Sequence, residues 1–481
     1  MNGTKQWRRK LPCQRHVHTK VPLVRVVCDM TIGDSTAARF RSILDAEAAV
    51  RRLRDDVLRM KLAELEQDTV MATWRTHHSA AYDHAVDMLL SPNVLNVVAS
   101  DYEIMGYVGE TANKKLMYLA ATSRIMADPL SVIIKSSSAA GKSKLVKATA
   151  ELMPMDQVED LSRVSKQALF NMERDALRHK LVIVMEKAGA DDADYSIRTL
   201  ITEKTLTSRV TMMSADGPHT ELRVVEGPVA YVTTTTDKVD EQLINRVLFL
   251  RVDESETQTA RIHEAQRASR TAQGLERGRR RSEIVTAHHI VQQALKPLKV
   301  AIPYATHLRF PTQSVTYRRQ NETFLNMISA IALLRQYQKP VLTLGPEPGS
   351  RERYIEADMT DYELAYHLAP AAFDLNAGPA LTLTQRRLLD EVRQYARANA
   401  GEGLPQDVQF TRADLEQTGW SAKQLKDHIP VLVETGCLAI HTDRGQGRRQ
   451  ILILAGPVDQ ADNALITPDD LRASIQTTTG I

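Results

Sequence analysis

Residues 131–143 read SVIIKSSSAAGKS, and this stretch decides how the rest of the chain is interpreted. Residues 131–135 are a short apolar run that predicts a buried strand. Residues 136–143 form a loop of small residues that ends in Gly-Lys-Ser, and residues 144–152 continue with helical spacing. A strand, a small-residue loop and a helix in this order bring free backbone N–H groups and a lysine together, which is an arrangement that binds phosphate.

The spacing matches a Walker A motif in which Ser136 stands where the first glycine usually lies. Lys142 would bridge the β- and γ-phosphates of ATP, and the Ser143 hydroxyl would ligate Mg²⁺. The predicted nucleotide-binding residues are Ser136, Ser137, Ser138, Ala139, Ala140, Gly141, Lys142 and Ser143. The alternative is a chance Ser/Ala-rich loop, but the flanking strand and helix favour the motif.

Short runs rich in β-branched residues alternate with helical segments from Leu130 onward. This alternation is typical of a parallel sheet with crossover helices. The runs that we expect to form strands are residues 131–134, 181–185, 229–235 and 247–252. The fold class is therefore predicted as α/β, with a P-loop sheet flanked by helices.

Polar residues follow two of these strands, at the edge of a parallel sheet where ligands usually bind. Glu186 comes directly after residues 181–185 and would hold the Mg²⁺ water shell or polarise the attacking water; a plain surface glutamate is the alternative. Threonines occupy positions 233–236, and we choose Thr235 to position water near the γ-phosphate. The preference of threonine for strands explains the same residues without any function.

Two arginines are candidates for contact with the γ-phosphate. Arg246 precedes the run 247–252, where an arginine finger would stabilise transition-state charge in a neighbouring subunit. Arg319 opens a predicted helix over residues 321–334 and would act from a helical lid, with Arg318 as the next choice. The alternatives are an ordinary salt-bridging arginine at position 246 and two exposed arginines in a first helical turn.

As a set, these features resemble the minichromosome-maintenance-like branch of AAA+ ATPases, and more closely the helicase module of bacterial mobile elements. The stretches that carry the resemblance are residues 134–143, 167–170, 179–181, 226–228, 243–246 and 252–255. The resemblance implies a ring-forming, hexameric helicase or translocase that uses ATP and Mg²⁺ on DNA, with a primase or initiator as partner. Lys187 stands where the family usually has a second acid, which favours a rival interpretation as a weakly hydrolysing switch, loader or regulator.

The same resemblance implies a β-hairpin at about residues 205–225 that reaches into the central pore of the ring. Turn-forming residues at 214–218 lie between two runs of β-branched residues. The hairpin would bring Arg209, His219 and Arg223 near DNA. An ordinary surface hairpin is the alternative.

Residues 381–456 are predicted as a winged helix, because three helical segments precede two alternating strands. Thr411 is the expected N-cap of the second helix. The third helix would enter the major groove, and the wing would contact phosphates. The expected DNA contacts are Lys423, Lys426, Arg444, Arg448 and Arg449. A winged helix used only for protein contacts is the alternative.

The chain has 481 residues, enough for about three domains, and a net charge of +3, which by itself argues little for nucleic acid. Three cysteines and the lack of a long apolar run predict a cytoplasmic protein. The predicted parts are a basic irregular N-terminus (1–36), a helical region (37–100), an ATPase core (101–255), a helical lid (256–345), a linker (346–380), the winged helix (381–456) and a polar tail (457–481).

Two further features stay open. The arginine-rich residues 277–281 would form either a DNA contact or a solvated loop. His288 and His289 are interpreted as a surface pair, in the same way as His77 and His78.

Overall fold

The computed structural model of this chain divides into two compact units. The first combines Met1–Ala305 with Thr323–Ala372, and the second combines Thr306–Glu322 with Phe373–Ile481. The residues that the structure describes are 56–136, 141–161, 169–185, 191–214, 217–235, 246–311, 316–344, 352–373, 383–401, 403–404, 407–434, 437–442, 450–454 and 465–479. Predictions for residues 1–36, and for 37–55 of the helical region, lie outside these ranges.

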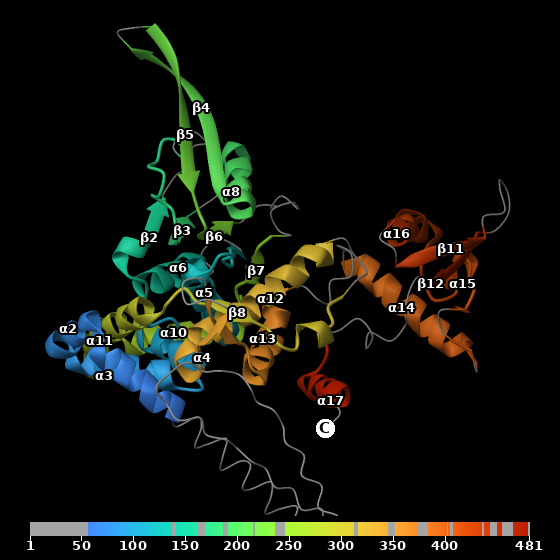
Figure 1. Ribbon diagram of the computed structural model, residues 1–481. Helices are drawn as coiled ribbons and strands as arrows, with labels where there is room; N and C mark the ends of the chain where they lie inside the picture. Colours follow the sequence, from blue (N-terminus) through green and yellow to red (C-terminus); the bar gives the residue numbers. More distant parts are fainter. Residues whose placement is uncertain are drawn as a thin grey trace, which may run out of the picture. The chain divides into compact units, whose positions relative to one another are not determined.

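A five-stranded parallel sheet forms the centre of the first unit, in the order β2-β3-β6-β1-β7 (Figure 1). The strands are β1 (Val132–Lys135), β2 (Val158–Leu161), β3 (Lys180–Val184), β6 (Val229–Thr235) and β7 (Leu248–Arg251). Four of them fall on the predicted apolar runs, because central parallel strands are buried on both faces. The sequence did not predict β2, whose Val-Glu-Asp-Leu is half-exposed at the edge of the sheet.

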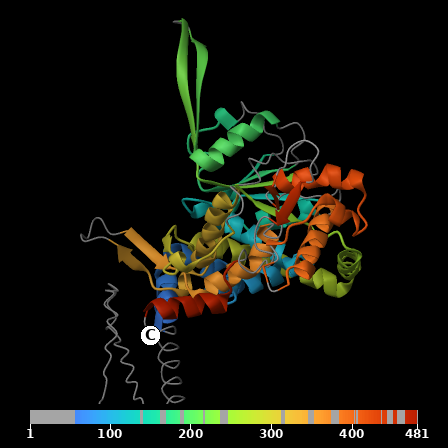
Figure 2. The same ribbon diagram turned by 90° about the vertical axis from the view of Figure 1, so that its right-hand side faces the viewer.

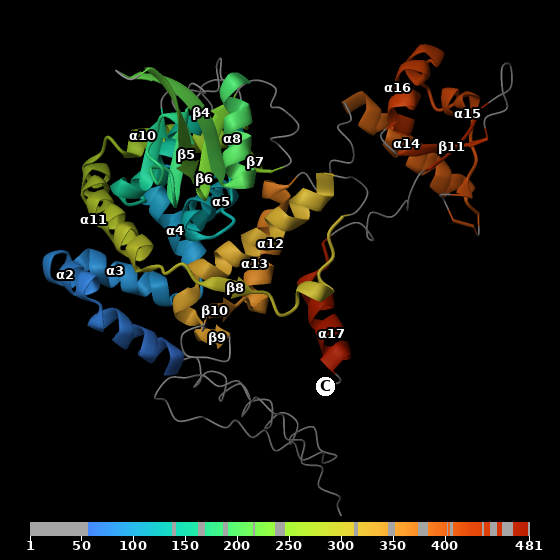
Figure 3. The same ribbon diagram turned by 45° about the horizontal axis from the view of Figure 1, so that its top comes forward.

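Helices that precede and follow the P-loop in the sequence pack around this sheet and on one another (Figure 3). They are α2 (Thr69–His77), α3 (Ser79–Leu90), α4 (Val94–Ile104), α5 (Thr111–Thr122), α6 (Lys142–Glu151), α8 (Asp191–Glu203), α10 (Glu256–Ala268) and α11 (Ala272–Ala294). Because α11 packs against α3 and α4, helices that precede and follow the sheet form one body. A short break separates α4 from α5, and Gly106 and Gly109 both have positive φ there, 87° and 73°.

A buried polar network joins four of these helices around Asp101 of α4. One carboxylate oxygen of Asp101 lies 3.0 Å from Nε2 of both His84 and His288. His288 Nδ1 lies 2.9 Å from the Tyr118 hydroxyl. Burial lowers the pKa of His288, although Asp101 opposes that shift. The predicted surface pair is therefore wrong for His288, which is a core residue of α11.

A long antiparallel hairpin lies between α8 and β6 in the sequence and extends beyond the sheet (Figures 1 and 2). Its strands, β4 (Thr205–Ser214) and β5 (Gly217–Glu226), pair over their whole length. Leu206 and Val225 at its base belong to the core of the first unit. The hairpin predicted at about residues 205–225 is confirmed.

The segment predicted as a linker, residues 346–380, is folded over 352–373. It supplies a strand and a helix to the first unit, and two further strands lie in the predicted helical lid. These elements are β8 (Lys299–Ala301), β9 (Leu342–Leu344), β10 (Glu352–Glu356) and α13 (Met359–Ala372), with β10 between β8 and β9. The predicted linker at residues 346–380 is therefore wrong over residues 352–373.

Paired charges explain how this polar segment is buried. Arg335 and Lys339, which follow α12 (Thr316–Leu334), meet two aspartates at the start of α13. Lys339 Nζ lies 2.6 Å from Asp358 and 2.7 Å from Asp361, and Arg335 pairs with both carboxylates. Burial opposes the ionisation of Asp358, but Lys339 and Arg335 outweigh it and lower the pKa of Asp358 to about 2.

Three helices and an antiparallel strand pair surround the core of the second unit. They are α14 (Leu383–Asn399), α15 (Arg412–Glu416), α16 (Ala422–Glu434), β11 (Leu438–Thr442) and β12 (Ile451–Leu454). Phe410 is buried and bridges to Leu452 of β12. Thr411 and Asp414 form a reciprocal capping box at the start of α15, so the predicted N-cap is confirmed.

The predicted polar tail over residues 457–481 is wrong for its last part. α17 (Pro468–Thr479) is a helix, and Leu471 on it is fully buried. Ser474 Oγ lies 2.9 Å from Nδ1 of His307, which fixes the helix within the second unit. Among the described residues, no helix is both long and apolar enough to cross a membrane.

Candidate nucleotide-binding site

The start of α6 forms the candidate phosphate site. Gly141 is the N-cap of this helix and has φ of 97°, a left-handed conformation that a residue with a side chain rarely adopts. A Cβ at this glycine would meet no atom within 4 Å, so backbone conformation rather than crowding requires it. Residues 137–140 of the predicted loop lie outside the described residues, and Ser143 is exposed in the first turn of α6.

Lys142 is folded back over the beginning of the loop. Its Nζ donates to the Ser136 carbonyl oxygen at 2.7 Å, and the residue is 9% exposed. The ammonium therefore lies at the carboxyl end of β1, beside the amino end of α6. A phosphate bound there would meet the lysine and the positive end of the helix dipole together.

The next strand brings a hydroxyl to the same edge of the sheet. Thr235 pairs in register with Lys135, the residue before Ser136, and is buried. Thr233 lies two residues earlier on the same face of β6, and its hydroxyl donates to the Val184 carbonyl at 2.8 Å. Thr233 therefore joins β6 to β3, whereas Thr235 lies beside the beginning of the P-loop. Its predicted role with water stays a prediction, and Thr236 lies outside the described residues.

The predicted metal ligand and acid, Glu186, lies outside the described residues, as does Lys187. The strand that leads to them, β3, is separated from β1 by β6. The ligand set Ser143 and Glu186 for Mg²⁺ therefore stays a prediction.

Of the two predicted arginines, Arg246 lies away from the phosphate site of its own chain. Arg246 comes two residues before β7, and its Nε donates to the Thr202 hydroxyl of α8 at 3.1 Å. Because β7 is parallel to β1, Arg246 is at the opposite end of the strands from the P-loop of its own chain. Arg319 belongs to the second unit, whereas Lys142 belongs to the first. Their predicted roles stay predictions.

Sequence reasoning missed a loop that packs against the start of α6. Lys144 Nζ donates to the Gly106 carbonyl at 2.5 Å, and the buried Gln258 Nε2 donates to the Val108 carbonyl at 2.7 Å. Gln258 also fills the space beside Gly109, where a Cβ would meet its amide at 2.2 Å.

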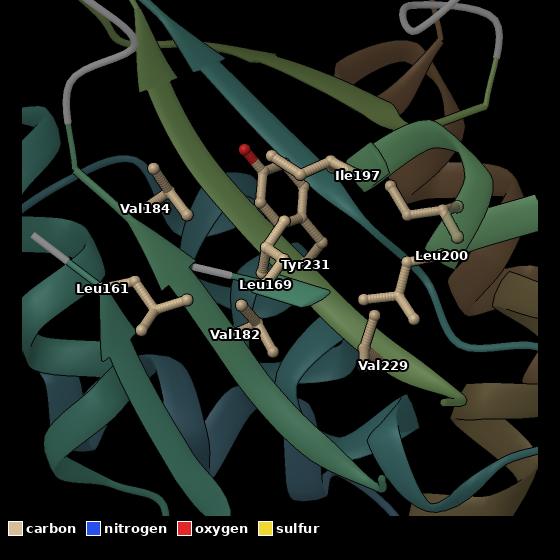
Figure 4. Close-up of a pocket in the computed structure, with 9 residues that line it drawn as sticks. Leu161, Leu169, Val182, Val184, Ile197, Leu200, Val229 and Tyr231 are labelled. Carbon is tan, nitrogen blue, oxygen red and sulfur yellow. The ribbon is translucent and has the colours of Figure 1, made fainter. Parts of the chain in front are cut away.

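A small cavity between α8 and the sheet is not the nucleotide site. It has a volume of about 10 Å³, and Figure 4 shows apolar side chains around it. The lining residues are Leu161, Leu169, Val182, Val184, Ile197, Leu200, Ile201, Val229 and Tyr231. A space of about one water molecule with apolar walls is a packing defect rather than a ligand pocket.

The β4–β5 hairpin divides the predicted DNA contacts between its two faces. Arg209 pairs with Leu222, whereas Arg223 pairs with Ser208, so the two arginines point to opposite faces. The alternation puts position 219 on the same face as Arg223. Arg223 contacts Asn171 and lies 3.6 Å from Glu221, while Arg209 is exposed. Contact of these residues with DNA stays a prediction.

On the second unit, Lys423 and Lys426 are exposed on α16, as a contact with DNA would require. Arg444, Arg448 and Arg449 lie outside the described residues.

Comparison with protein families agrees with the geometry of the phosphate site. A family model described as the MTBMA_p00010 P-loop domain matches residues 79–294. This part of the chain is a P-loop domain. The match runs from the start of α3 to the end of α11, so it includes the sheet, the β4–β5 hairpin and the helices on either side. No curated protein matches the chain.

The predicted α/β fold with a P-loop sheet is confirmed at this level. A P-loop domain binds a nucleotide, typically with Mg²⁺, through the loop between its first strand and the next helix. The residues that would hold it here are Lys142 and the backbone around Ser136 and Gly141.

Proposed function

We propose that this chain is an AAA+ ATPase of the minichromosome-maintenance-like kind, which forms a ring and moves along or unwinds DNA. ATP would bind at Lys142 and Ser143 with Mg²⁺, and Glu186 and Thr235 would position the attacking water. The P-loop family match, the buried Lys142 and the neighbouring Thr235 support an ATPase; the further features below support its action on DNA.

The observation that carries the proposal is the position of the β4–β5 hairpin in the fold. The hairpin comes directly before β6, the strand between the P-loop strand β1 and β3. A hairpin before this strand is a feature of the family that the sequence resembles, where it reaches DNA in the pore. Nucleotide-dependent motion of β6 would move the hairpin, because its second strand ends at Glu226, only three residues before β6 begins.

The position of Arg246 supports assembly of several copies. The residue lies at the far end of the sheet from Lys142, so it cannot stabilise γ-phosphate charge in its own subunit. In a ring, the Arg246 of one subunit would reach the ATP of its neighbour. A hexamer is the assembly that we propose by resemblance.

The second unit supports a role in DNA binding. Its three helices and strand pair have the element order of a winged helix, and the exposed Lys423 and Lys426 lie on the third helix. We propose that it selects or holds the DNA on which the ring loads, in replication of a mobile element, plasmid or phage. A primase or initiator protein is the partner that we propose for this role.

A second candidate function is a slow nucleotide switch that loads or regulates other proteins on DNA. Lys187 favours it, because a lysine follows Glu186 where a second carboxylate is expected. Losing one positioned base typically costs about a hundredfold or more in rate. A Lys187→Glu variant that turns over ATP faster than the parent would support this explanation of a slow parent.

ATP turnover with and without single-stranded DNA, together with displacement of a labelled strand, tests the proposal. A DNA-stimulated ATPase that separates strands is the expected result. Turnover that ignores DNA, without strand displacement, would favour the switch. No binding of ATP at all would overturn both functions.

A further inference from the structure

The consecutive helices α10 and α11 carry arginines that the phosphate site does not use. Its residues 261–281 contain seven arginines, two glutamates and no lysine. Six of the arginines are exposed, and we define them as the arginine cluster: Arg261, Arg267, Arg270, Arg277, Arg279 and Arg280. The earlier alternative of a solvated loop at 277–281 is wrong in one respect, because these residues lie in α11.

Close backbone contacts fix the turn between α10 and α11. The Thr271 hydroxyl accepts from the Gly274 N–H at 3.1 Å and donates to the Ala268 carbonyl at 2.8 Å. Gly274 approaches α10 so closely that a Cβ there would meet the Ala268 carbonyl oxygen at 2.3 Å. The arginines are therefore carried by a defined helical scaffold, which lowers the ordering cost of binding a ligand.

The charge of the arginine cluster is not neutralised by ion pairs within the described part of the chain. Within the described part of the chain, none of its six members forms a salt bridge, although Glu264 and Glu276 lie among them in the sequence. Arg281, at the base of the cluster, is different: it pairs with Glu151 and donates to the Met105 carbonyl at 2.9 Å. One arginine thus anchors α11 to the end of α6, and the other six face solvent.

We propose that the arginine cluster binds the sugar–phosphate backbone of DNA, as a contact separate from the β4–β5 hairpin and the second unit. Guanidinium groups match phosphate oxygens in bidentate geometry, and lysine does not. Residues 272–281 span about 15 Å along α11, the length of roughly four phosphates of one strand. The contact would be independent of base sequence. The inference rests on the proposed function for the identity of the ligand.

An acidic protein is the other polyanion that exposed arginines bind. Protein interfaces are centred on apolar and aromatic side chains. Over residues 256–281, all of which the structure describes, Leu275 is the one large apolar side chain that is exposed, at 69%. Ile262 is half-buried on α10, and no aromatic residue occurs in the segment. These observations favour a phosphate backbone.

The full-length R277Q/R279Q/R280Q variant tests the proposal by binding of labelled single-stranded and duplex DNA over a range of salt. Losing three phosphate contacts should make the slope of log affinity against log salt shallower by about two to three units. The R277K/R279K/R280K variant should keep most of the slope, because the charges remain. The matched control R59Q/R75Q/R472Q removes the same charge from exposed arginines that pair with their own acids, and its slope should equal the parent's.

An unchanged slope in the glutamine variant would overturn the inference and leave the proposed function standing. A parent protein that binds no DNA would overturn both the inference and the proposed function. A shallower salt slope in the glutamine variant, with normal ATP turnover in the absence of DNA, supports both. Competition by polyglutamate as strong as by DNA of equal charge would overturn the inference in favour of an acidic protein. If the R277Q/R279Q/R280Q variant shows no cooperative unfolding transition, and so is not folded, Glu276→Gln is tested instead. Removing this acidic residue from the arginine cluster should make DNA binding tighter. Unchanged DNA binding by Glu276→Gln would overturn the inference.

Discussion

Two buried lysines of the first unit have different kinds of partner. Lys142 directs its Nζ to the carbonyl of Ser136, at the start of the P-loop. Lys339 lies between the carboxylates of Asp358 and Asp361, at 2.6 and 2.7 Å. A phosphate can displace a carbonyl as the partner of an ammonium, whereas two carboxylates hold it firmly. Burial of a charge therefore does not identify a functional site; the chemistry of its partner does.

The largest expected effect is the loss of ATP turnover in Lys142→Met. The ammonium would neutralise charge on the transferred phosphate, so its removal should lower turnover about a thousandfold or more. Thermal unfolding should change far less than turnover, because the carbonyl partner of the ammonium is neutral, unlike a carboxylate. Steady-state phosphate release and a melting curve measure the two effects. A variant that hydrolyses ATP normally would remove the P-loop from the mechanism.

Arg246→Ala should lower turnover by about a thousandfold while ATP binding stays intact, as for an arginine finger. Mixing this variant with Lys142→Met should restore part of the activity, since some interfaces then contain both native residues. Turnover is followed across mixing ratios, with each variant alone as control. Full activity in a species that remains monomeric at every concentration would contradict the proposal of a ring.

Lys339→Met makes the same substitution at the other lysine. Here we expect the stability of the fold to fall and ATP turnover to be kept. Removing one member of a buried ion-pair network typically costs about 3–5 kcal/mol. We expect the free energy of unfolding to fall by about that amount, measured by denaturant titration. Turnover per folded molecule should match the parent. A stable variant with impaired turnover would show that the distinction between the two lysines is wrong.

Thr233 and Thr235 of β6 allow the same comparison, between a structural and a functional side chain, within one strand. Thr235→Val should lower turnover by about ten- to a hundredfold if its hydroxyl positions water. Thr233→Val loses the hydrogen bond to the Val184 carbonyl and should cost about 1 kcal/mol of stability, with little effect on rate. The two variants control for each other. Equal effects on rate would mean that neither hydroxyl has a specific role.

The smallest effect concerns pH. The folded-state pKa of Asp358, about 2, is below its usual value, so its ion pairs add stability above about pH 4. This contribution should be lost as the pH falls from about 4 towards 2. The difference in melting temperature between the parent and Asp358→Asn should shrink over that range. A constant difference would show that the charge of Asp358 is not what stabilises α13.

The sequence predicted the parts of the fold that repeat a simple pattern. The four apolar strands and the phosphate loop have local signatures. The hairpin was predicted from the family resemblance, and the turn-forming residues 214–218 agreed with it. Sequence analysis did not predict the edge strand β2, because its residues Val-Glu-Asp-Leu do not form an apolar run. Sequence analysis did not predict the helix α13, because its burial depends on Arg335 and Lys339, which precede it by about twenty residues. A pairing over this distance leaves no local pattern in the sequence.

The candidate site was predictable to a similar extent. Gly141 and Lys142 follow from the motif, and Thr235 follows from the order of the strands. By contrast, the bond from Thr233 to Val184 depends on strand register, and the fully buried His288 depends on Asp101, which lies far away in the sequence. Two adjacent histidines or threonines look alike in a sequence, and only three-dimensional contacts distinguish them.

The β4–β5 hairpin also has a consequence for handling the protein. Among the described strands, neither β4 nor β5 pairs with a third, so the outer edge of each one offers unpaired backbone groups to another molecule. One face of the hairpin carries four threonines, Thr205, Thr207, Thr211 and Thr220. Threonine favours strands, and its hydroxyl leaves less exposed apolar surface than valine or isoleucine would. At high protein concentration, intermolecular strand pairing should begin at this hairpin. A charged residue in place of the exposed Leu222 is the substitution that would keep the protein soluble.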